Sequence, residues 1–289
     1  MGRFEGQLRQ RSAAAEKHRK VIEVRTRTIR VARVGLAMSS IRAIESTFHI
    51  NLRSVQELID FDRTVLDAAV QIIDGLRVSV DQNHPALADR IGNAVQMLRN
   101  VRTNDSMRSH YETIYNQCVV LLVSHFGSAL HSIFRLSAPT RLASSAEKDA
   151  LKDELKFSLA ELNELDFQMR ERIGDLLVSK RDISFQDMQS TRRAFKGYLG
   201  VEIGSGAHVN NIILAQAARN AIVHSGAVID VKFVKQVSGA KPRDLKLQVA
   251  EGERLAFVPA EVEQVASNMR EFVANITRQL DAPPAKNVF

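Results

Sequence analysis

The sequence predicts a mainly α-helical protein, an antiparallel helical bundle with one small β-hairpin near the C-terminus. Three observations support this prediction. Apolar residues recur at steps of three and four through most of the chain, which is the spacing of one helix face. Only one late stretch, residues 245–258, alternates as strands do. The composition, 45% hydrophobic and 25% charged over 289 residues, is that of a globular chain with one large or two modest domains.

The first predicted helix follows a heptad-like apolar stripe between residues 52 and 76, which suits a long helix packed on another helix. We interpret this stripe as core. Its members are Leu52, Val55, Ile59, Asp62, Leu66, Ala69, Ile73 and Leu76, with Asp62 the one polar exception. The residues DQNHP at 81–85 end this helix, and a shorter helix is predicted from 86 to 101.

A long and heavily buried helix is predicted next, opened by a cap at Asp105. The residues SAPTRLASS at 137–145 break it. Ser144 and Glu147 have the spacing of a capping box for the following helix. That helix would bury Leu151, Leu155, Leu159, Leu162, Met169, Ile173 and Leu176.

The last third of the chain begins with a helix over residues 185–199, and GSG at 204–206 predicts a turn into the next helix. The stretches LKLQV (245–249) and RLAFV (254–258) flank AEGE and predict the hairpin. Pro259 suits the first position of a closing helix. The apolar face of that helix is Val262, Val265, Met269, Phe272, Ile276 and Leu280.

The positive charge of the chain is concentrated at its N-terminus. Residues 1–34 hold ten Lys or Arg and three acidic residues, while the other 255 residues hold 30 of each sign. A basic arm of this kind attracts polyanions, nucleic acid first, although a solvated helix face or a grip on an acidic partner would have the same composition. We place a boundary near residue 104, between a basic N-terminal helical region (1–104) and a second helical domain (105–289).

Several classes of protein are not expected. The longest purely apolar run, residues 118–123, is too short to cross a bilayer, and the N-terminus has no apolar signal core. The single cysteine, Cys118, cannot form an internal disulfide and is expected to be a small buried hydrophobe. The sequence therefore predicts a cytoplasmic protein without membrane contact.

The stretch AARNAIVHSG, residues 217–226, places three polar side chains in an otherwise small or apolar segment. Asn220 and His224 lie one helical turn apart and share a face, whereas Arg219 lies about 140° around the axis from His224. Gly226 suits a left-handed cap, which would put His224 in the last turn. A histidine exposed there suits proton transfer, and the guanidinium fork of Arg219 suits a phosphate. Either these are satisfied polar groups at a helix end, or they form the working site.

RNAIVH followed by glycine resembles the Arg-Asn-x-x-x-His signature of the HEPN superfamily, all-helical domains found widely in prokaryotic toxins and antiviral systems. The likeness extends to the long hydrophobic helix CVVLLVSHFGSALHSIF, to the segment ISFQDMQSTRRAFKGYLG, and to the hairpin and closing amphipathic helix. It covers about residues 105–280. The first hundred residues lie outside it.

Active members of this family are metal-independent endoribonucleases. The resemblance implies that the RNA 2′-hydroxyl attacks the adjacent phosphate, which leaves a 2′,3′-cyclic phosphate and a 5′-hydroxyl. It assigns His224 as acid/base, Arg219 as phosphate stabiliser and Asn220 as positioning group. One imidazole cannot hold both proton roles in a single step. Family members commonly dimerise with facing motifs, so the resemblance implies a homodimer, with RNA as substrate.

The sequence departs from two family patterns. Gly127 follows Phe126, where some branches place a glutamate. Ser225 and Gly226 follow the histidine, where other branches have x-Tyr, a site that a nucleotidyltransferase antitoxin modifies. That version of the partnership is therefore not expected, while an antitoxin or defence-system protein remains an expected partner.

Three further cations, Arg192, Arg193 and Lys196, cluster on the helix before the motif. They are either a solvated face or a groove for the RNA backbone. No Cys/His/Asp cluster has metal-ligand spacing and no phosphate loop is present, so neither a metal nor another cofactor is expected. Two alternatives to the nuclease stay open. One is a catalytically silent HEPN-like module for RNA binding or protein assembly, and the other is a coiled-coil-like structural protein.

Overall fold

The computed structural model describes residues 40–61, 64–77, 84–100, 105–144 and 153–281. Within these ranges the chain is mainly α-helical, which confirms the predicted class, and no residue is assigned to a β-strand. The basic arm, residues 1–34, lies outside the described residues, so its contact with nucleic acid stays a prediction. Asp62 of the heptad-like stripe also lies outside them.

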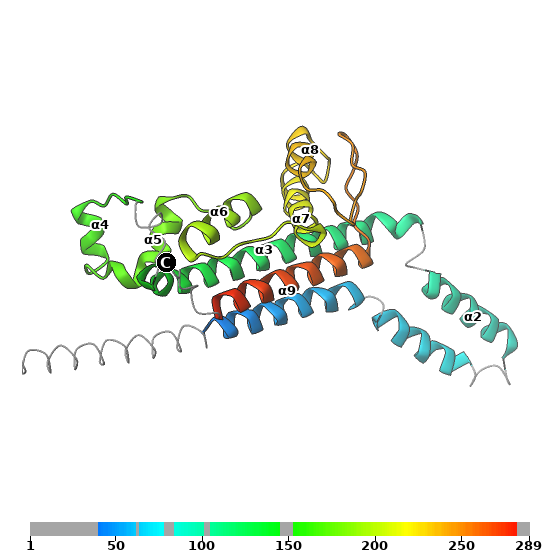
Figure 1. Cartoon of the computed structure of the whole chain (residues 1–289). Coiled ribbons are helices and arrows are strands. Elements are labelled where there is room, and N and C mark those ends of the chain that lie inside the picture. The colour runs from blue at the N-terminus through cyan, green and yellow to red at the C-terminus, as the bar shows by residue number, and fades with distance from the viewer. Residues whose placement is uncertain (1–39, 62–63, 78–83, 101–104, 145–152, 282–289) are drawn as a thin grey trace, which may run out of the picture.

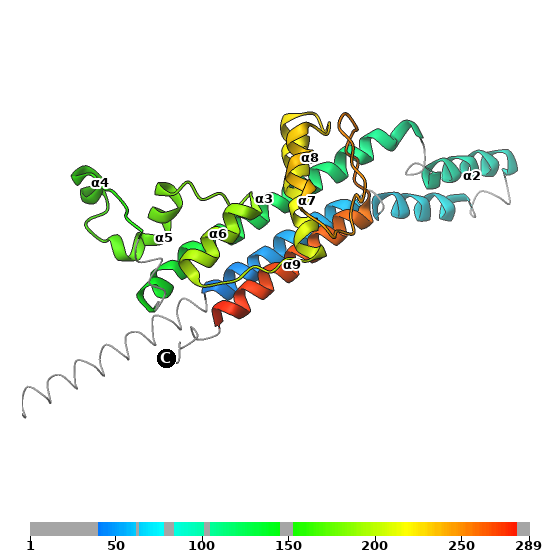
Figure 2. The same cartoon turned by 45° about the horizontal axis from the view of Figure 1, so that its top comes forward.

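Three helices form the centre of the molecule and lie side by side in Figure 1 and Figure 2: residues 40–61, α3 (Asp105–Ser144) and α9 (Pro259–Asp281). α3 and α9 run in the same direction, and residues 40–61 run against them. The C-terminal ends of α3 and α9 are joined by Arg141, which donates hydrogen bonds to the carbonyl oxygens of Gln279 and Leu280 at 2.9 and 2.8 Å.

The core is one continuous cluster of buried side chains to which all three central helices contribute. The Phe126 ring of α3 contacts Phe272 of α9 and Phe48 of the first helix, at centroid distances of 5.2 and 6.3 Å. The apolar face predicted for α9 is buried in full, which confirms that prediction: Val262, Val265, Met269, Phe272, Ile276 and Leu280. The boundary predicted near residue 104 stays a prediction, because residues 101–104 lie outside the described residues.

A second layer of shorter helices covers α3. α5 (Met169–Lys180), α6 (Met188–Leu199) and α7 (Ala207–His224) pack against it, and α7 also contacts α9 and α8 (Val231–Ser238). Figure 1 shows α6 and α7 above α3, on the side away from residues 40–61. α8 is absent from the sequence prediction, although Asp230 caps its N-terminus by accepting a hydrogen bond from the Phe233 N–H at 2.7 Å.

Residues 64–77 and α2 (Pro85–Asn100) form an antiparallel pair that extends beyond the central helices, as both Figure 1 and Figure 2 show. An ion pair between Arg99 and Asp74, at 2.8 Å, joins the two helices. The residues of the heptad-like stripe are divided between two packing environments. Its first members, Leu52, Val55 and Ile59, are buried in the main core, as predicted, but Leu66, Ala69 and Ile73 are half-buried and Leu76 is exposed.

The break predicted at residues 137–145 is wrong, because α3 continues through Pro139 to Ser144. Proline has no N–H, so the carbonyl oxygen of Arg135, four residues earlier, loses its usual helical partner. α5 approaches α3 at this point, with Gly174 directly against the Arg135 backbone. Ser137 and Ala138, just before the proline, are buried.

The single helix predicted from Ser144 to Leu176 is also wrong. The described part contains two helices, α4 (Leu159–Glu164) and α5, while residues 145–152, which include Glu147, lie outside it. The capping box that forms is Ser158 with Glu161, at the start of α4. Asp166 and Phe167 then have φ values of 49° and 57°, a left-handed backbone that ends the helix.

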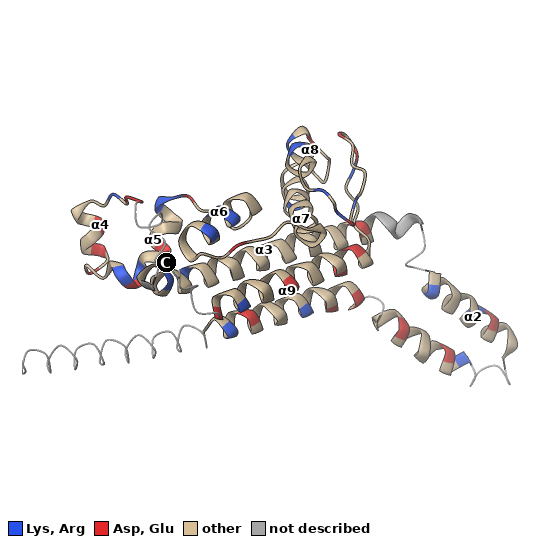
Figure 3. Cartoon of the chain, in the orientation of Figure 1, with Lys and Arg blue, Asp and Glu red and all other residues tan. Residues whose placement is uncertain are grey.

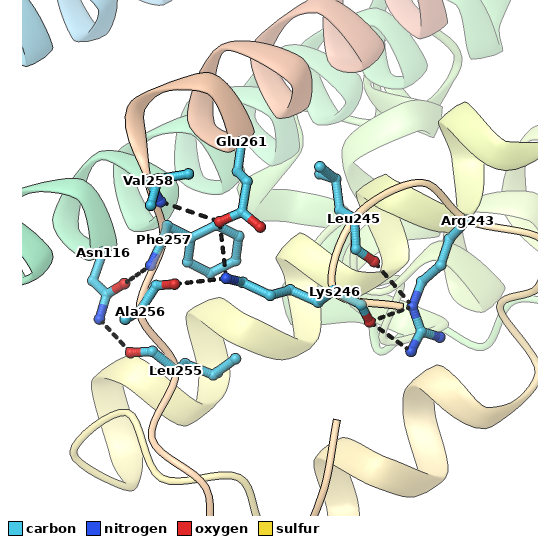
Figure 4. A network of polar contacts seen from close by, with 9 residues as sticks. All are labelled: Asn116, Arg243, Leu245, Lys246, Leu255, Ala256, Phe257, Val258 and Glu261. Atoms are coloured by element: carbon cyan, nitrogen blue, oxygen red, sulfur yellow. Dashed lines mark hydrogen bonds and ion pairs between the residues drawn. The ribbon is translucent and has the colours of Figure 1, made fainter. Parts of the chain in front are cut away.

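The predicted hairpin does not form. Residues 254–255 meet residues 227–228 instead, through an isolated antiparallel bridge between Val228 and Arg254 and a hydrogen bond from the Leu255 N–H to the Ala227 carbonyl at 2.7 Å. Side chains replace the expected ladder (Figure 4). The Asn116 amide bonds the Leu255 carbonyl at 2.9 Å and the Phe257 N–H at 3.1 Å.

Arg243, just before the other predicted strand (245–249), bonds backbone groups in a similar way. Its buried guanidinium donates to the carbonyl oxygens of Leu245 and Lys246 at 3.0–3.2 Å, and to Val237 at the end of α8 at 3.1 Å. Burial lowers the pKa of this guanidinium. Because these carbonyls are satisfied by a side chain, they are unavailable to a neighbouring strand. Leu245, Leu255 and Phe257 of the alternating stretch are buried, whereas Leu247 is 69% exposed, and residues 252–255 pair with residues 227–229 instead of with 245–249.

By length and composition one helix of the described part, His110–Ala143, could cross a membrane. It has 34 residues and its most apolar window has a mean hydropathy of 1.4, and half of that window is buried in this structure. The core helix of a globular protein has the same properties, and α3 is the helix against which α5, α6, α7 and α9 pack. The expected absence of membrane contact stays a prediction.

We expect Gly174→Ala to destabilise the protein by about 1–3 kcal/mol, since an added methyl group in a tight contact forces backbone shifts. That methyl group would lie 2.7 Å from the Arg135 Cα. The matched control is Gly197→Ala in α6, where nothing lies within 4 Å, and where alanine should stabilise the helix by about 0.5–1 kcal/mol. Urea unfolding measures both changes, and equal effects would contradict the close approach of α5 to α3.

Arg243→Met is expected to lower the free energy of unfolding by about 2–5 kcal/mol, because several buried carbonyl oxygens lose their donor together. Arg193→Met, at an exposed position of α6, should change it by less than about 0.5 kcal/mol. Thermal unfolding followed by circular dichroism compares the two. A variant of Arg243 as stable as wild type would show that segment 239–258 does not depend on this guanidinium.

Candidate functional site

The predicted motif lies at the end of α7, a helix buried along most of its length. The turn predicted at residues 204–206 leads into α7, and Gly206 occupies the N-cap position. Small side chains allow α7 to sit closely between α3, α8 and α9. Its buried apolar residues are Val209, Ile212, Leu214, Ala215, Ala217, Ala218 and Ala221.

Hydrogen bonds from asparagines fix the first half of α7. The Asn211 side chain donates to Asn268 of α9 at 2.9 Å and accepts from the backbone N–H groups of Asp244 and Leu245 at 3.1 and 3.2 Å. Asn210 donates to the Pro242 carbonyl at 2.7 Å. Sequence reasoning did not single out these asparagines, although two adjacent amides in an apolar helix are a signal of buried hydrogen bonding.

α7 ends where the motif predicts. His224 is the last helical residue, the N–H groups of Ser225 and Ala227 both bond the Ala221 carbonyl, at 2.9 and 3.0 Å, and Gly226 has a φ of +60°. This left-handed glycine is the cap that the sequence predicts. It places His224 in the last turn of α7.

The three motif side chains differ in exposure. Asn220 and His224 are exposed and share one face of α7, one turn apart, whereas Arg219 is half-buried. The structure brings Arg219 and Asn220 together, since Nη1 of Arg219 donates a hydrogen bond to Oδ1 of Asn220 at 3.1 Å. The Nε atom of Arg219 is buried without a hydrogen-bond partner among the described residues. An accessible imidazole and a guanidinium held by an amide are thus present at one surface.

Gln216 is a further polar residue of this face that sequence reasoning missed. It precedes Asn220 by one turn and His224 by two, so the three side chains follow one line along α7. Gln216 is completely buried, and neither polar atom of its amide has a hydrogen-bond partner among the described residues. The spacing of Gln216, Asn220 and His224 at i, i+4 and i+8 could have indicated that they share one helix face. It extends the polar line of the motif from the surface into the protein.

Exposed apolar side chains occur close in sequence to the end of α7. Val223, Val228 and Val231 are 47%, 41% and 62% exposed, and all lie within seven residues of His224 in the sequence. Exposed apolar groups around a polar pair are typical of surfaces that another molecule covers.

The cations predicted on α6 have separate roles in the structure. Arg192 donates to the Gly204 carbonyl at 2.9 Å, and Lys196 forms an ion pair with Glu202 at 2.8 Å. The hydrogen bond and charge of Lys196 lower the pKa of that carboxyl. Both cations therefore tie the segment before α7 to α6, and only Arg193 is exposed without a partner in the described part. RNA binding by these three residues stays a prediction.

A cavity of about 590 Å³ lies away from the motif. It lies between the end of the first helix, the start of α3 and residues 256–259. Lys246 on its wall pairs with Glu261 at 2.9 Å and donates to the Ala256 carbonyl at 2.7 Å (Figure 4). Its ammonium also lies 5.3 Å from the centre of the Phe257 ring. None of the motif residues lines this cavity, and the contacts of Lys246 hold segment 239–258 in place.

Among the described residues no group of three or more His, Cys, Asp or Glu side chains is placed to hold a metal ion. Cys118 is fully buried, as the sequence predicts, and burial raises the pKa of its thiol to about 11.

Comparisons with known proteins give no match to this chain, neither among protein-family models, nor among curated proteins, nor among solved structures.

We expect the Cys118 thiol to resist alkylation by iodoacetamide in the native protein at pH 8 and to react once urea unfolds the chain, because burial disfavours the reactive thiolate. A thiol pKa raised on folding gives a stabilising contribution that is complete below the ordinary pKa of 9.0 and is lost as the pH rises toward about 11. Mass spectrometry after timed labelling measures the reaction, and rapid native labelling at pH 8 would contradict this burial.

Proposed function

We propose that this chain is a metal-independent endoribonuclease of the HEPN type, acting as a cytoplasmic toxin or antiviral defence effector. The observation that carries the proposal is the end of α7, where an exposed His224 shares a face with Asn220, and where Asn220 accepts a hydrogen bond from Arg219. These are the residues that match the Arg-Asn-x-x-x-His signature. Their exposure allows contact with a polymer as large as RNA.

The reaction uses groups that these residues provide. A neutral imidazole takes the proton of the ribose 2′-hydroxyl, and that oxygen attacks the adjacent phosphorus. The bond from phosphorus to the 5′-oxygen breaks, and an imidazolium protonates the leaving oxygen. The products are a 2′,3′-cyclic phosphate and a 5′-hydroxyl. The Arg219 guanidinium offsets the charge on the phosphorane, and Asn220, bonded to that guanidinium, positions it.

Two subunits are needed because one His224 cannot be base and acid in the same step. The exposed Val223, Val228 and Val231 around the motif support a homodimer there, since a second copy could cover them and bring its own His224 to the same phosphate. A site that uses one neutral and one protonated imidazole has a bell-shaped dependence of rate on pH.

A second candidate function is a silent HEPN-like module that binds RNA or assembles with an antitoxin or defence-system protein. The hydrogen bond between Arg219 and Asn220 favours it, because it gives Nη1 of Arg219 and Oδ1 of Asn220 a partner at the helix end without a substrate. Under this proposal the protein binds RNA but leaves the chain intact.

His224→Ala is expected to reduce the rate of RNA cleavage about 10²–10⁴-fold, since a general acid/base is lost. The assay uses the full chain, excess chelator and a labelled RNA, and identifies the cyclic phosphate end by mass spectrometry. An RNA with 2′-deoxyribose at the cleaved linkage should stay whole. The control is His84→Ala, another exposed histidine that lies just before α2 and should keep full activity.

Mixing tests the shared site. An excess of folded His224→Ala chains should lower the activity of each wild-type chain, because a mixed dimer holds one imidazole in place of two. Unchanged activity per wild-type chain would contradict the two-subunit mechanism. Binding of RNA by wild type without cleavage would replace the nuclease by the silent module, and absence of both would overturn the proposed function.

A further inference from the structure

The antiparallel pair of helices 64–77 and α2 carries a second apolar stripe that the core does not use. On residues 64–77 this stripe consists of Val65, Ile72 and Leu76, which are 51%, 66% and 57% exposed. The steps of seven and four place the three side chains on one line. They lie roughly 90° around the helix from Leu66 and Ile73, the half-buried residues of the same helix.

α2 carries the matching surface. Leu87 and Met97 are 45% and 73% exposed, and they lie roughly 130° around the helix from Ala88 and Val95, the buried residues of α2. When each helix is viewed from its own N-terminus, the exposed residues are rotated from the buried ones in the same direction. Because the two helices run antiparallel (Figure 2), equal senses of rotation bring both stripes to the same side of the pair. We call this surface the tip face: Val65, Ile72, Leu76, Leu87 and Met97.

We propose that a second copy of this chain covers the tip face, in a twofold contact in which two helix pairs form a four-helix arrangement. A lone helix pair cannot bury both of its apolar sides, whereas two pairs can bury them against each other. A twofold axis brings the same patch of both copies together, so a self-complementary apolar face is sufficient.

The charges of the pair favour this occupant over a charged one. Residues 64–77 hold Asp67, Asp74 and Arg77, and α2 holds Asp89, Arg90 and Arg99, so the pair has no net charge. Two copies can therefore approach without net repulsion, and nothing here attracts a polyanion such as RNA.

The area of the tip face is sufficient for a dimer. Its five side chains expose on the order of 600 Å² per chain, so two copies bury about 1,200 Å², the lower limit for specific protein interfaces. An exposed apolar patch of several hundred Å² is often a functional surface.

This contact is independent of the proposed ribonuclease site. The tip face belongs to residues 64–100, which lie before the helix that carries His224 and outside the part that resembles the HEPN superfamily. Association at the tip can therefore be lost without loss of the motif, and the reverse holds for His224→Ala.

The test is the mass of the full chain in solution, measured by sedimentation velocity over a range of protein concentrations. The double variant Ile72→Glu/Leu76→Glu should halve the mass of the assembly and raise its dissociation constant at least about 100-fold, since each chain would bury two charges. The matched control is Leu159→Glu/Phe167→Glu, at positions 80% and 67% exposed in and after α4, which should keep the wild-type mass.

A second variant and a second measurement test the same contact independently. Met97→Glu, on the other helix of the pair, should weaken association in the same way, while His224→Ala should keep the wild-type dissociation constant at the tip. Hydrogen exchange of wild type should slow in residues 64–77 and 85–100 as the protein concentration rises. A wild type that stays monomeric at all concentrations, or a double variant with the mass of wild type, would overturn the proposal.

Discussion

The burial of α3 on several sides is the constraint on which the rest of the structure depends. A helix of 40 residues with apolar groups around much of its circumference is stable in water only if other helices cover it. Helix 40–61 and α9 cover one side, and α5, α6 and α7 cover the other. The positions of α5, α6 and α7 follow from this requirement, and α7 is the helix that carries the candidate site.

Polar side chains then determine how the segments around α7 are held. Asn211 and Arg243 bond backbone groups that would otherwise be unpaired in the interior. Asn116 of α3 does the same for the segment before α9. Each lies within the protein and satisfies several backbone groups at once. As a result α7 is held by its first half, and its last turn, with Asn220 and His224, reaches the surface.

Two regions of the described surface expose apolar side chains. The valines around His224 lie beside polar groups suited to phosphate chemistry, whereas the tip face is apolar and its helix pair has no net charge. The physical difference explains the different proposals: the first surface offers reactive groups to a ligand, and the second offers only buried area. Loss of one contact need not affect the other.

Much of this arrangement can be predicted from the sequence, because it depends on local spacing. The face of α9, the start of that helix at Pro259, the burial of Cys118, and the end of α7 at His224 with a left-handed Gly226 all follow from periodicity and capping. The motif residues themselves were recognised by type and spacing. The exposure of Asn220 and His224, and the half-burial of Arg219, were decided by the packing of α7.

Tertiary contacts decided the features that local rules gave wrongly. α3 passes through Pro139 in a region where α5 packs closely against its backbone, and a local rule cannot include a helix 35 residues away. Residues 245–258 alternate like strands, yet Arg243, Asn116 and Asn211 satisfy their backbone, so no hairpin forms. The sequence by itself determined which faces are apolar and where helices can end, while only the fold determined which backbone groups find side-chain partners, since those partners are distant in sequence.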